Sequence, residues 1–423
     1  RVNGRWLLQL LTHHLAIDHT ALDILVEEIR MIQQDRAAEL APALPFRNFV
    51  AQARLGVSAA EHETFFTRML SDIDEPSAPY GLLDVQGGVA ELDEARLVLP
   101  DDLAETLRAQ ARTLGVSAAS LMHLAWAQVL SKLTGRQEVV FGTVLFGRMQ
   151  GGAGADRVLG MFINTLPVRI SIGDRGVAEG VRGTHALLTQ LLRHEHAPLA
   201  LAQRCSAVQA PLPLFSSLLN YRHSQRNEVT DADSGWDGVV VLTTADRSTY
   251  PLTLSVDDFG EGFALTVQVD RSVSAGRICA YMQTALEHFT SLAGRPKDTE
   301  TSLLSMDILP DTERSLVLSD WNATDAAYPS ELGVHQVFEQ QVALRPQAVA
   351  LVHDQKTLSY AELNAHANRL AHHLIAQGIG AGDCVATCLE RSAGLVIAQL
   401  AILKAGAAYV PLDAVLPPAR QAA

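Results

Sequence analysis

Positive charge is scarce in this 423-residue chain, which has 33 Lys and Arg against 47 Asp and Glu and a formal net charge of −14. No run of basic residues interrupts this balance. Nucleic-acid binding depends on clustered Lys and Arg that neutralise phosphates, so the composition argues against a nucleic-acid partner. Hydrophobic residues still make up 48% of the chain, which is enough to bury large cores in two or three domains.

Cysteine is also rare, with four residues whose spacing suggests no disulfide framework. This usage favours a reducing, cytoplasmic location. Cys384 and Cys388 are close enough in sequence to suggest a metal pair, but no second pair of Cys or His lies near them. We therefore predict that both are core residues of a buried strand and that no metal is bound.

Long apolar runs are missing too, since no stretch reaches the roughly 18 residues of a membrane span. The first residues, up to Leu11, resemble a strand that enters a core. Polar residues follow them without a small-residue cleavage site, which argues against a signal peptide. The sequence begins without Met and stops soon after Asp413, so we expect it to be a fragment of a longer polypeptide.

Hydrophobic periodicity predicts an α/β chain in which helices and strands alternate. One helix is predicted over 20–34 with Thr20 as its N-cap, and 36–50 and 74–92 are predicted to be irregular. Further helices are predicted over 60–73, 101–115, 117–134, 177–194, 274–293, 334–343, 360–377 and 391–405. Strands and hairpins are predicted over 5–17, 97–100, 139–144, 162–172, 213–221, 239–243, 256–269, 347–359 and 384–388.

The densest group of titratable residues includes His13, His14, Asp18 and His19, on a predicted strand-to-helix turn. A carboxylate that folds back onto an imidazole could orient it for proton transfer. The same residue types could supply metal ligands, although adjacent histidines on a strand point to opposite faces. They could equally form a polar surface turn. Residue types alone leave catalysis, a metal site and a plain turn open.

The order of these residues resembles the His-His-x-x-x-Asp-Gly signature of the condensation domains of nonribosomal peptide synthetases, which are chloramphenicol-acetyltransferase-like. Later segments agree in order with this family: Gly147-Arg148, the Gly-Met-Phe-Ile-Asn-Thr stretch at 160–165, His-Glu-His-Ala-Pro at 194–198 and the strand at 213–221. Trp321-Asn322 is similar to the family's linker into an adenylation domain. The stretches at 358–364 and 403–413 are similar to that domain's first two core motifs.

The resemblance implies a two-lobed fold like that of CoA-dependent acyltransferases. Residues 1–92 would be the remainder of the N-lobe with the His motif, 93–295 the C-lobe, 296–333 a linker, and 334–423 the start of an adenylate-forming α/β domain. A segment before the His pair and the adenylation domain's phosphate loop are missing from the sequence. We therefore expect the isolated chain to be inactive.

The implied reaction is peptide-bond formation between a donor acyl or peptidyl thioester and an acceptor aminoacyl amine. Upstream and downstream carrier domains would present both groups on 4′-phosphopantetheine. The condensation site itself would bind no cofactor, and ATP and Mg²⁺ would be used only by a complete adenylation domain. Expected partners are these carriers and the chain's own adenylation domain, with no nucleic acid and no membrane.

By the same resemblance, His14 takes the catalytic position, where it orients or deprotonates the acceptor amine. His13 would be structural, and Asp18 would pair with an arginine to shape the turn. Arg148 and Asn164 lie in matching motifs, and for each a buried hydrogen bond that holds loops together is at least as good an interpretation as direct catalysis.

His19 stands where the family has Gly after the Asp, and it would either crowd a ligand or be tolerated there. This departure favours one alternative, a degenerate docking module without activity. An epimerisation domain shares the His-His signature, but an adenylation start follows here. A dual condensing and epimerising domain is the other alternative, because its second His motif would lie upstream.

Other polar residues are expected to be structural. His194 and His196 are typical of packing histidines at a helix end. Ser216 and Ser217 lack the Gly-x-Ser-x-Gly elbow of a serine nucleophile.

Two turns are also expected to carry no chemistry. Asp257 and Asp258 are predicted to be solvated in a turn. The glycines at 151–154 are predicted to form a flexible loop and not a phosphate cradle, because no Lys-Ser or Lys-Thr pair follows them.

Overall fold

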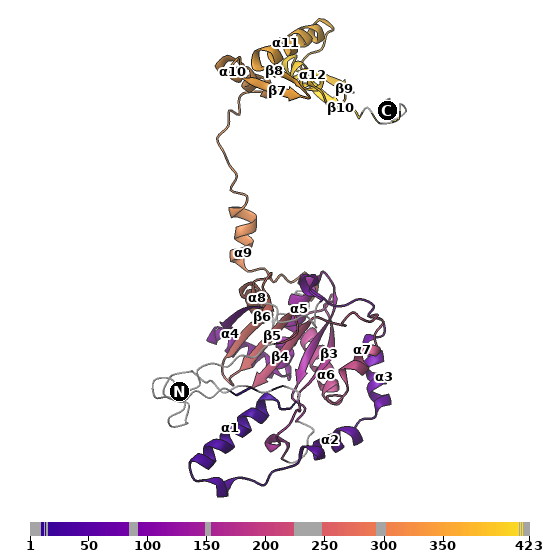
Figure 1. The fold of residues 1–423 in the computed structure, drawn as a ribbon, viewed down its shortest axis with the longest axis vertical. Helices are drawn as coiled ribbons and strands as arrows, with labels where there is room; N and C mark the ends of the chain where they lie inside the picture. Colours follow the sequence, from indigo (N-terminus) through magenta and orange to yellow (C-terminus); the bar gives the residue numbers. More distant parts are fainter. Residues whose placement is uncertain are drawn as a thin grey trace. The chain divides into compact units, whose positions relative to one another are not determined.

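The computed structural model describes residues 10–11, 13, 16–83, 92–148, 154–223, 248–292, 302–413, 415 and 417. The chain divides into two compact units, Arg1–Trp321 and Asn322–Ala423 (Figure 1). The strand predicted at 239–243, most of the one predicted at 5–17, and most of the glycine loop predicted at 151–154 lie outside the described residues.

A six-stranded mixed sheet organises the first unit, with strand order β1-β6-β5-β4-β2-β3. β4 is parallel to both its neighbours, β2 and β5, whereas the other pairs are antiparallel. β-Branched and aromatic residues favour these strands because they pack well on a pleated surface. The strands are β1 (Leu92–Val98), β2 (Glu138–Leu145), β3 (Asn164–Ser171), β4 (Ser217–His223), β5 (Leu252–Asp258) and β6 (Phe263–Asp270).

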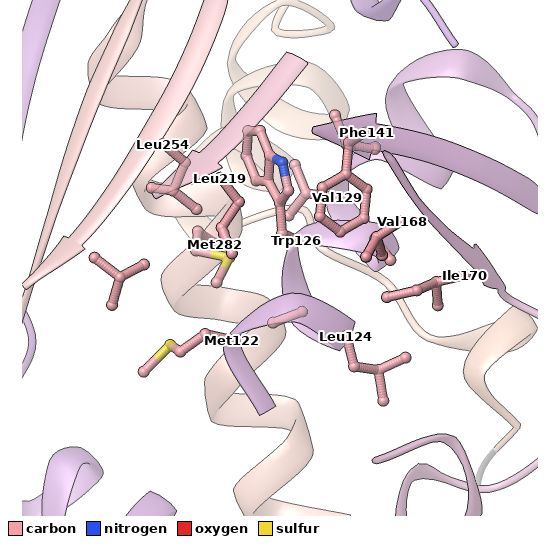
Figure 2. Packing of buried hydrophobic residues seen from close by; sticks show 14 of the residues in the cluster. Met122, Leu124, Trp126, Val129, Phe141, Val168, Ile170, Leu219, Leu254 and Met282 are labelled. Atoms are coloured by element: carbon pink, nitrogen blue, oxygen red, sulfur yellow. The ribbon is translucent and has the colours of Figure 1, made fainter. Parts of the chain in front are cut away.

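Two long helices, α5 (Ala118–Thr134) and α8 (Ala275–Leu292), pack on each other and against the sheet. Trp126 of α5 lies at the centre of this core, close to Phe141 of β2 and Met282 of α8 (Figure 2). All three side chains are fully buried, and burying a side chain such as Phe or Met stabilises a fold by about 1.5–3 kcal/mol. The other helices around the sheet are α4 (Asp101–Leu114), α6 (Val177–Leu192) and α7 (Leu199–Arg204).

Three helices precede the sheet: α1 (His19–Gln33), α2 (Phe46–Leu55) and α3 (Ala59–Leu70). The predicted cap of the first helix is wrong by two residues, because the carboxylate of Asp18, and not Thr20, accepts the free backbone N–H of Ala21. The prediction that 36–50 is irregular is also wrong, since α2 begins at Phe46. Phe46 and Phe49 anchor that helix on a small aromatic cluster with Phe162.

The described part of the predicted linker packs partly on the first unit. Leu303, Met306 and Ile308 belong to its hydrophobic core. The side-chain amide of Gln128 on α5 donates to the carbonyls of Leu303 at 2.9 Å and Met306 at 3.2 Å. The segment contains the short helices η5 (Leu303–Ser305), α9 (Asp311–Ser315) and η6 (Leu316–Asp320). The boundary between the two units thus lies well inside the stretch 296–333.

The second unit follows the predicted alternation closely. Its elements are α10 (Val334–Leu344), β7 (Val349–His353), β8 (Lys356–Ser359), α11 (Tyr360–Ala376), β9 (Cys384–Thr387), α12 (Ala393–Lys404) and β10 (Ala408–Pro411). β7 and β8 form an antiparallel hairpin, and β9 and β10 pair in parallel. The prediction of core cysteines is wrong, because Cys384 and Cys388 are exposed. Within the described residues, the four-residue strand β9 pairs with β10 alone, so its ends stay open to solvent.

Within the described ranges, no single helix is long and apolar enough to cross a membrane, and α4 with α5 meets that test only as a pair bent by 108°. Across the same ranges, no group of three or more His, Cys, Asp or Glu residues is placed to hold a metal ion.

Candidate functional site

The histidine motif leads directly into α1. His14, the predicted catalytic residue, lies outside the described residues. His13 is exposed, and its carbonyl accepts the backbone N–H of Ala16 at 2.8 Å. The chain then reaches Asp18, which is only 2% exposed. The described ends of the motif are therefore a surface turn at His13 and a buried carboxylate at Asp18.

Asp18 joins three separate parts of the first unit. Its Oδ1 accepts the backbone N–H of Ala21 and the Nη2 of Arg148, both at 2.8 Å. Its Oδ2 accepts the backbone N–H of Phe162 at 3.1 Å, and its own N–H donates to the carbonyl of Gly160 at 3.3 Å. One carboxylate thus caps α1 and ties the end of the histidine motif to the connection between β2 and β3.

Arg148 is the counter-charge of Asp18, and the family resemblance implied that an arginine would pair with this carboxylate. Its Nη1 donates to the carbonyls of Ala155 at 2.6 Å and Val158 at 3.0 Å, and its Cζ lies 4.0 Å from the centre of the Phe162 ring. The preceding Gly147 has φ +66°, and a Cβ there would lie 2.0 Å from the carbonyl oxygen of Phe162. Only glycine fits this close approach at position 147.

Asn164 holds a different loop. Its Nδ2 donates to the carbonyls of Glu195 at 2.8 Å and Ala197 at 2.7 Å, and its Oδ1 accepts the N–H of Thr165 at 2.9 Å. The side chain thereby fastens the turn between α6 and α7 to the start of β3. This is a loop-holding geometry, and the structure brings Asn164 into this turn, not into the Asp18–Arg148 pair.

His194 and His196, in that same turn, pack against aromatic rings. The Nδ1 of His194 lies 2.9 Å from the Nδ1 of His62 on α3, and its ring stacks on Phe65 at 4.2 Å. His196 meets Phe49 edge to face at 5.0 Å. Burial lowers the pKa of all three histidines. Sequence reasoning missed His62, because nothing in its own helix marks a partner 132 residues away.

His19 does not extend into the core. It is the first residue of α1, its side chain is 75% exposed, and its Nε2 lies 3.8 Å from the Oδ2 of Asp23. At this position the side chain that replaces the family's Gly lies toward solvent.

The prediction that Asp257 and Asp258 are solvated is wrong. They end β5 with exposures of 7% and 4%, because arginines from other elements pair with both. Asp257 accepts from Arg222 at 2.9 Å, and Asp258 accepts from Arg108 and from the hydroxyl of Tyr221 at 2.5 Å. Burial opposes ionisation of Asp258, but hydrogen bonds from Arg108 and Tyr221 outweigh it and lower the pKa. Burial and Asp258 together raise the pKa of Tyr221.

Two further polar features are buried in the sheet layer. Ser216 and Ser217 are fully buried, and neither hydroxyl has a hydrogen-bond partner among the described residues, so neither is activated as a nucleophile. Sequence reasoning missed His123 on α5, which lies 2.7 Å from the carbonyl of Ala119 and 2.8 Å from the hydroxyl of Thr143. Burial lowers the pKa of His123 to about 4, so it is neutral at pH 7.

A small cavity of about 80 Å³ borders the Phe162 cluster. It is far smaller than the roughly 300–1,000 Å³ of typical small-molecule sites. Its lining residues are Leu44, Pro45, Asn48, Phe49, Ala155, Val158 and Phe162. The cavity is thus a gap between α2 and the loop before β3.

Comparisons with protein families match nearly the whole chain. The model of the condensation domain matches residues 2–317, and the model of the AMP-binding enzyme matches residues 338–423. Malpibaldin synthetase and malpinin synthetase of Mortierella alpina are 50% and 49% identical to 99% and 98% of this chain. One of the linear gramicidin synthase proteins of Brevibacillus parabrevis is 33% identical over 96% of it. The chain spans only 8%, 5% and 5% of the lengths of these three relatives.

Solved structures share the fold at lower identity. Holo-AB3403, a four-domain nonribosomal peptide synthetase bound to AMP and glycine, aligns with a TM-score of 0.72 at 19% identity, over 96% of this chain and 32% of that chain. The first condensation domain of the calcium-dependent antibiotic synthetase, in complex with a substrate analogue, aligns with a TM-score of 0.51 at 20% identity, over 71% and 66% of the two chains.

Proposed function

Because the chain belongs to the condensation-domain family and continues into residues that match AMP-binding enzymes, we propose that it carries the peptide-bond-forming site of a nonribosomal peptide synthetase. One observation supports this most directly: the buried Asp18 ends the histidine motif and is held there by Arg148 at 2.8 Å. A plain surface turn does not need such an anchor.

The proposed reaction is aminolysis of a thioester. The acceptor amine attacks the donor carbonyl carbon, the C–N bond forms, the C–S bond breaks, and the proton lost by the amine ends on the departing thiol. His14 would orient the amine or accept its proton. Holding both reactants in one geometry supplies much of the rate, so the Asp18–Arg148 pair would contribute by fixing the end of the histidine motif.

Both reactants would arrive on 4′-phosphopantetheine arms of an upstream and a downstream carrier domain, and the site itself would hold no cofactor. ATP and Mg²⁺ would serve the complete adenylation domain that residues 338–423 begin. The four cysteines are free, which supports a cytoplasmic location. We propose that the chain acts only within a longer synthetase, since it spans 8% of a relative that is 50% identical.

Substitution of His14 tests the proposal in the synthetase module that contains this chain, with both carriers loaded. His14→Ala should remove most of the dipeptidyl product, measured by mass spectrometry of the carrier-bound species. His373→Ala is a matched control, because His372 and His373 form another adjacent pair that is exposed on α11. Equal product from His14→Ala and wild type would contradict the proposal, and an inactive wild type would favour a non-catalytic docking module.

A further inference from the structure

We propose that Phe162 is a positioning residue for the condensation reaction and acts through the face of its ring. The ring fixes the guanidinium of Arg148, Arg148 fixes Asp18, and Asp18 fixes the end of the histidine motif. This inference rests on the proposed function, and it adds a role for a side chain that touches neither reactant.

The contact between Phe162 and Arg148 is buried. The Cζ of Arg148 lies 4.0 Å from the ring centre, Phe162 is 2% exposed, and the side chain of Arg148 is 10% exposed. A cation over an aromatic face is attracted by the negative potential of the ring, and the attraction is strongest where water is excluded. The ring is therefore placed to stabilise a charge that has lost most of its hydration.

The hydrogen bonds of Arg148 do not satisfy every N–H of its guanidinium group. Its Nη1 and Nη2 atoms donate to the carbonyls of Ala155 and Val158 and to Asp18. The Nε is buried and has no hydrogen-bond partner among the described residues. An unpartnered N–H on a buried cation is costly, and the π face of Phe162 is the remaining electrostatic partner of the guanidinium plane.

Phe162 itself cannot move freely. Its ring lies 4.2 Å from the ring of Phe49 and packs edge to face on Phe46 at 5.2 Å. Its backbone N–H donates to Asp18 at 3.1 Å, and Gly147 approaches its carbonyl so closely that a Cβ would lie 2.0 Å away. One residue thus contacts both members of the ion pair and is anchored to α2.

Loosening this contact should affect the rate more than binding. A misplacement of about 1 Å in a catalytic group can lower a rate about 100-fold. The reactants bind through their carriers and pantetheine arms, which Phe162 does not contact in this proposal. We therefore expect kcat to fall while KM for the loaded carriers stays constant.

Fluorinated phenylalanines separate the electrostatic role of the ring from its packing role. One, two or three fluorines at position 162 keep the ring shape but progressively weaken the negative face. In the intact module with loaded carriers, kcat for dipeptide formation should fall stepwise, by about tenfold at the trifluoro stage. The same series at Phe66 is the matched control, because Phe66 is fully buried and no cation lies over its ring among the described residues. There, kcat should stay constant.

Two natural substitutions provide a second test that does not depend on fluorination. Phe162→Leu removes the π face and should lower kcat, whereas Phe162→Tyr keeps the face and should retain most of it. A flat fluorine series, or equal kcat for the Leu and Tyr variants, would overturn the inference while His14→Ala still abolishes product. If His14→Ala makes as much product as wild type, the proposed function itself fails.

Discussion

Single residues in this structure carry charges whose burial must be offset by a specific partner. Asp18 has 1% of its side chain exposed and Arg148 has 10%, so each is the main compensation for the other. Removing one member of a buried pair leaves an uncompensated charge and typically costs about 3–5 kcal/mol. The exposed pair of Arg36 and Glu39 is compensated by water, so such pairs contribute little.

We therefore predict that Arg148→Met lowers the free energy of unfolding of the first unit by about 3–5 kcal/mol. The measurement is urea unfolding at pH 7, followed by tryptophan fluorescence, which reports on the buried Trp126. Arg36→Met, a substitution of the same chemistry at an exposed pair, should leave the unfolding midpoint nearly unchanged. Similar midpoints for the two variants would show that Asp18 is not held by its arginine.

Among the elements, α3 and the turn between α6 and α7 meet through a pair of histidines. His62 and His194 share one hydrogen bond between their Nδ1 atoms at 2.9 Å, which requires that at least one of these atoms is unprotonated. Burial is the largest cause that lowers the pKa of both. Around the pair, Glu61 favours protonation of both rings, whereas Arg193 and Arg68 oppose protonation of His194.

The sign of the pH dependence follows from these lowered pKa values. Each histidine binds a proton more readily in the unfolded chain, with a pKa near 6.5, than in the folded one. The stability that the pair contributes is thus fully present above about pH 6.5 and is lost as the pH falls through the folded pKa values. The protection factors of α3 amides, which correct for the slower intrinsic exchange at lower pH, should fall as the pH drops below about 6.5. His62→Asn keeps a polar atom near the Nδ1 position but cannot titrate, so it should weaken the pH dependence of these protection factors. The same pH dependence in this variant and in the wild type would contradict a role for the histidine pair.

Elements were predictable where the signal is local. Apolar spacing located α4, α5 and α11 within one or two residues, because one face or all of each helix is buried. The helix α2 was missed because an Ala- and Pro-rich sequence hides a short apolar face that becomes visible only against Phe162. Asp257 and Asp258 were misplaced for a related reason: the partner of Asp258, Arg108, lies 150 residues away. Contacts between distant elements leave no mark on the periodicity of either one.

At the scale of the whole molecule, the same limit applies to where one unit ends. The resemblance implied a linker over 296–333, yet Leu303, Met306 and Ile308 complete the core of the first unit. The order of the motifs carried the resemblance to the family, and that resemblance implied the pairing of Asp18 with an arginine. Motif order could not show that this segment packs on α5 and α6, because the packing depends on whether those helices leave room for its side chains. Gly180 of α6 provides this space: a Cβ there would lie 2.6 Å from a methyl group of Leu303.

This packing predicts that the segment after residue 301 is part of the folding unit and not a free tether. Leu303→Ala should lower the free energy of unfolding of the first unit by about 2–5 kcal/mol, because Leu303 is fully buried and its truncation leaves a cavity. Leu304→Ala is the matched control. Leu304 is the next residue and is 40% exposed, so this substitution should lower the free energy of unfolding only slightly. Urea unfolding of both variants, followed by tryptophan fluorescence, measures the difference. A free tether would make the two substitutions equivalent, whereas a structural segment makes only the first one destabilising.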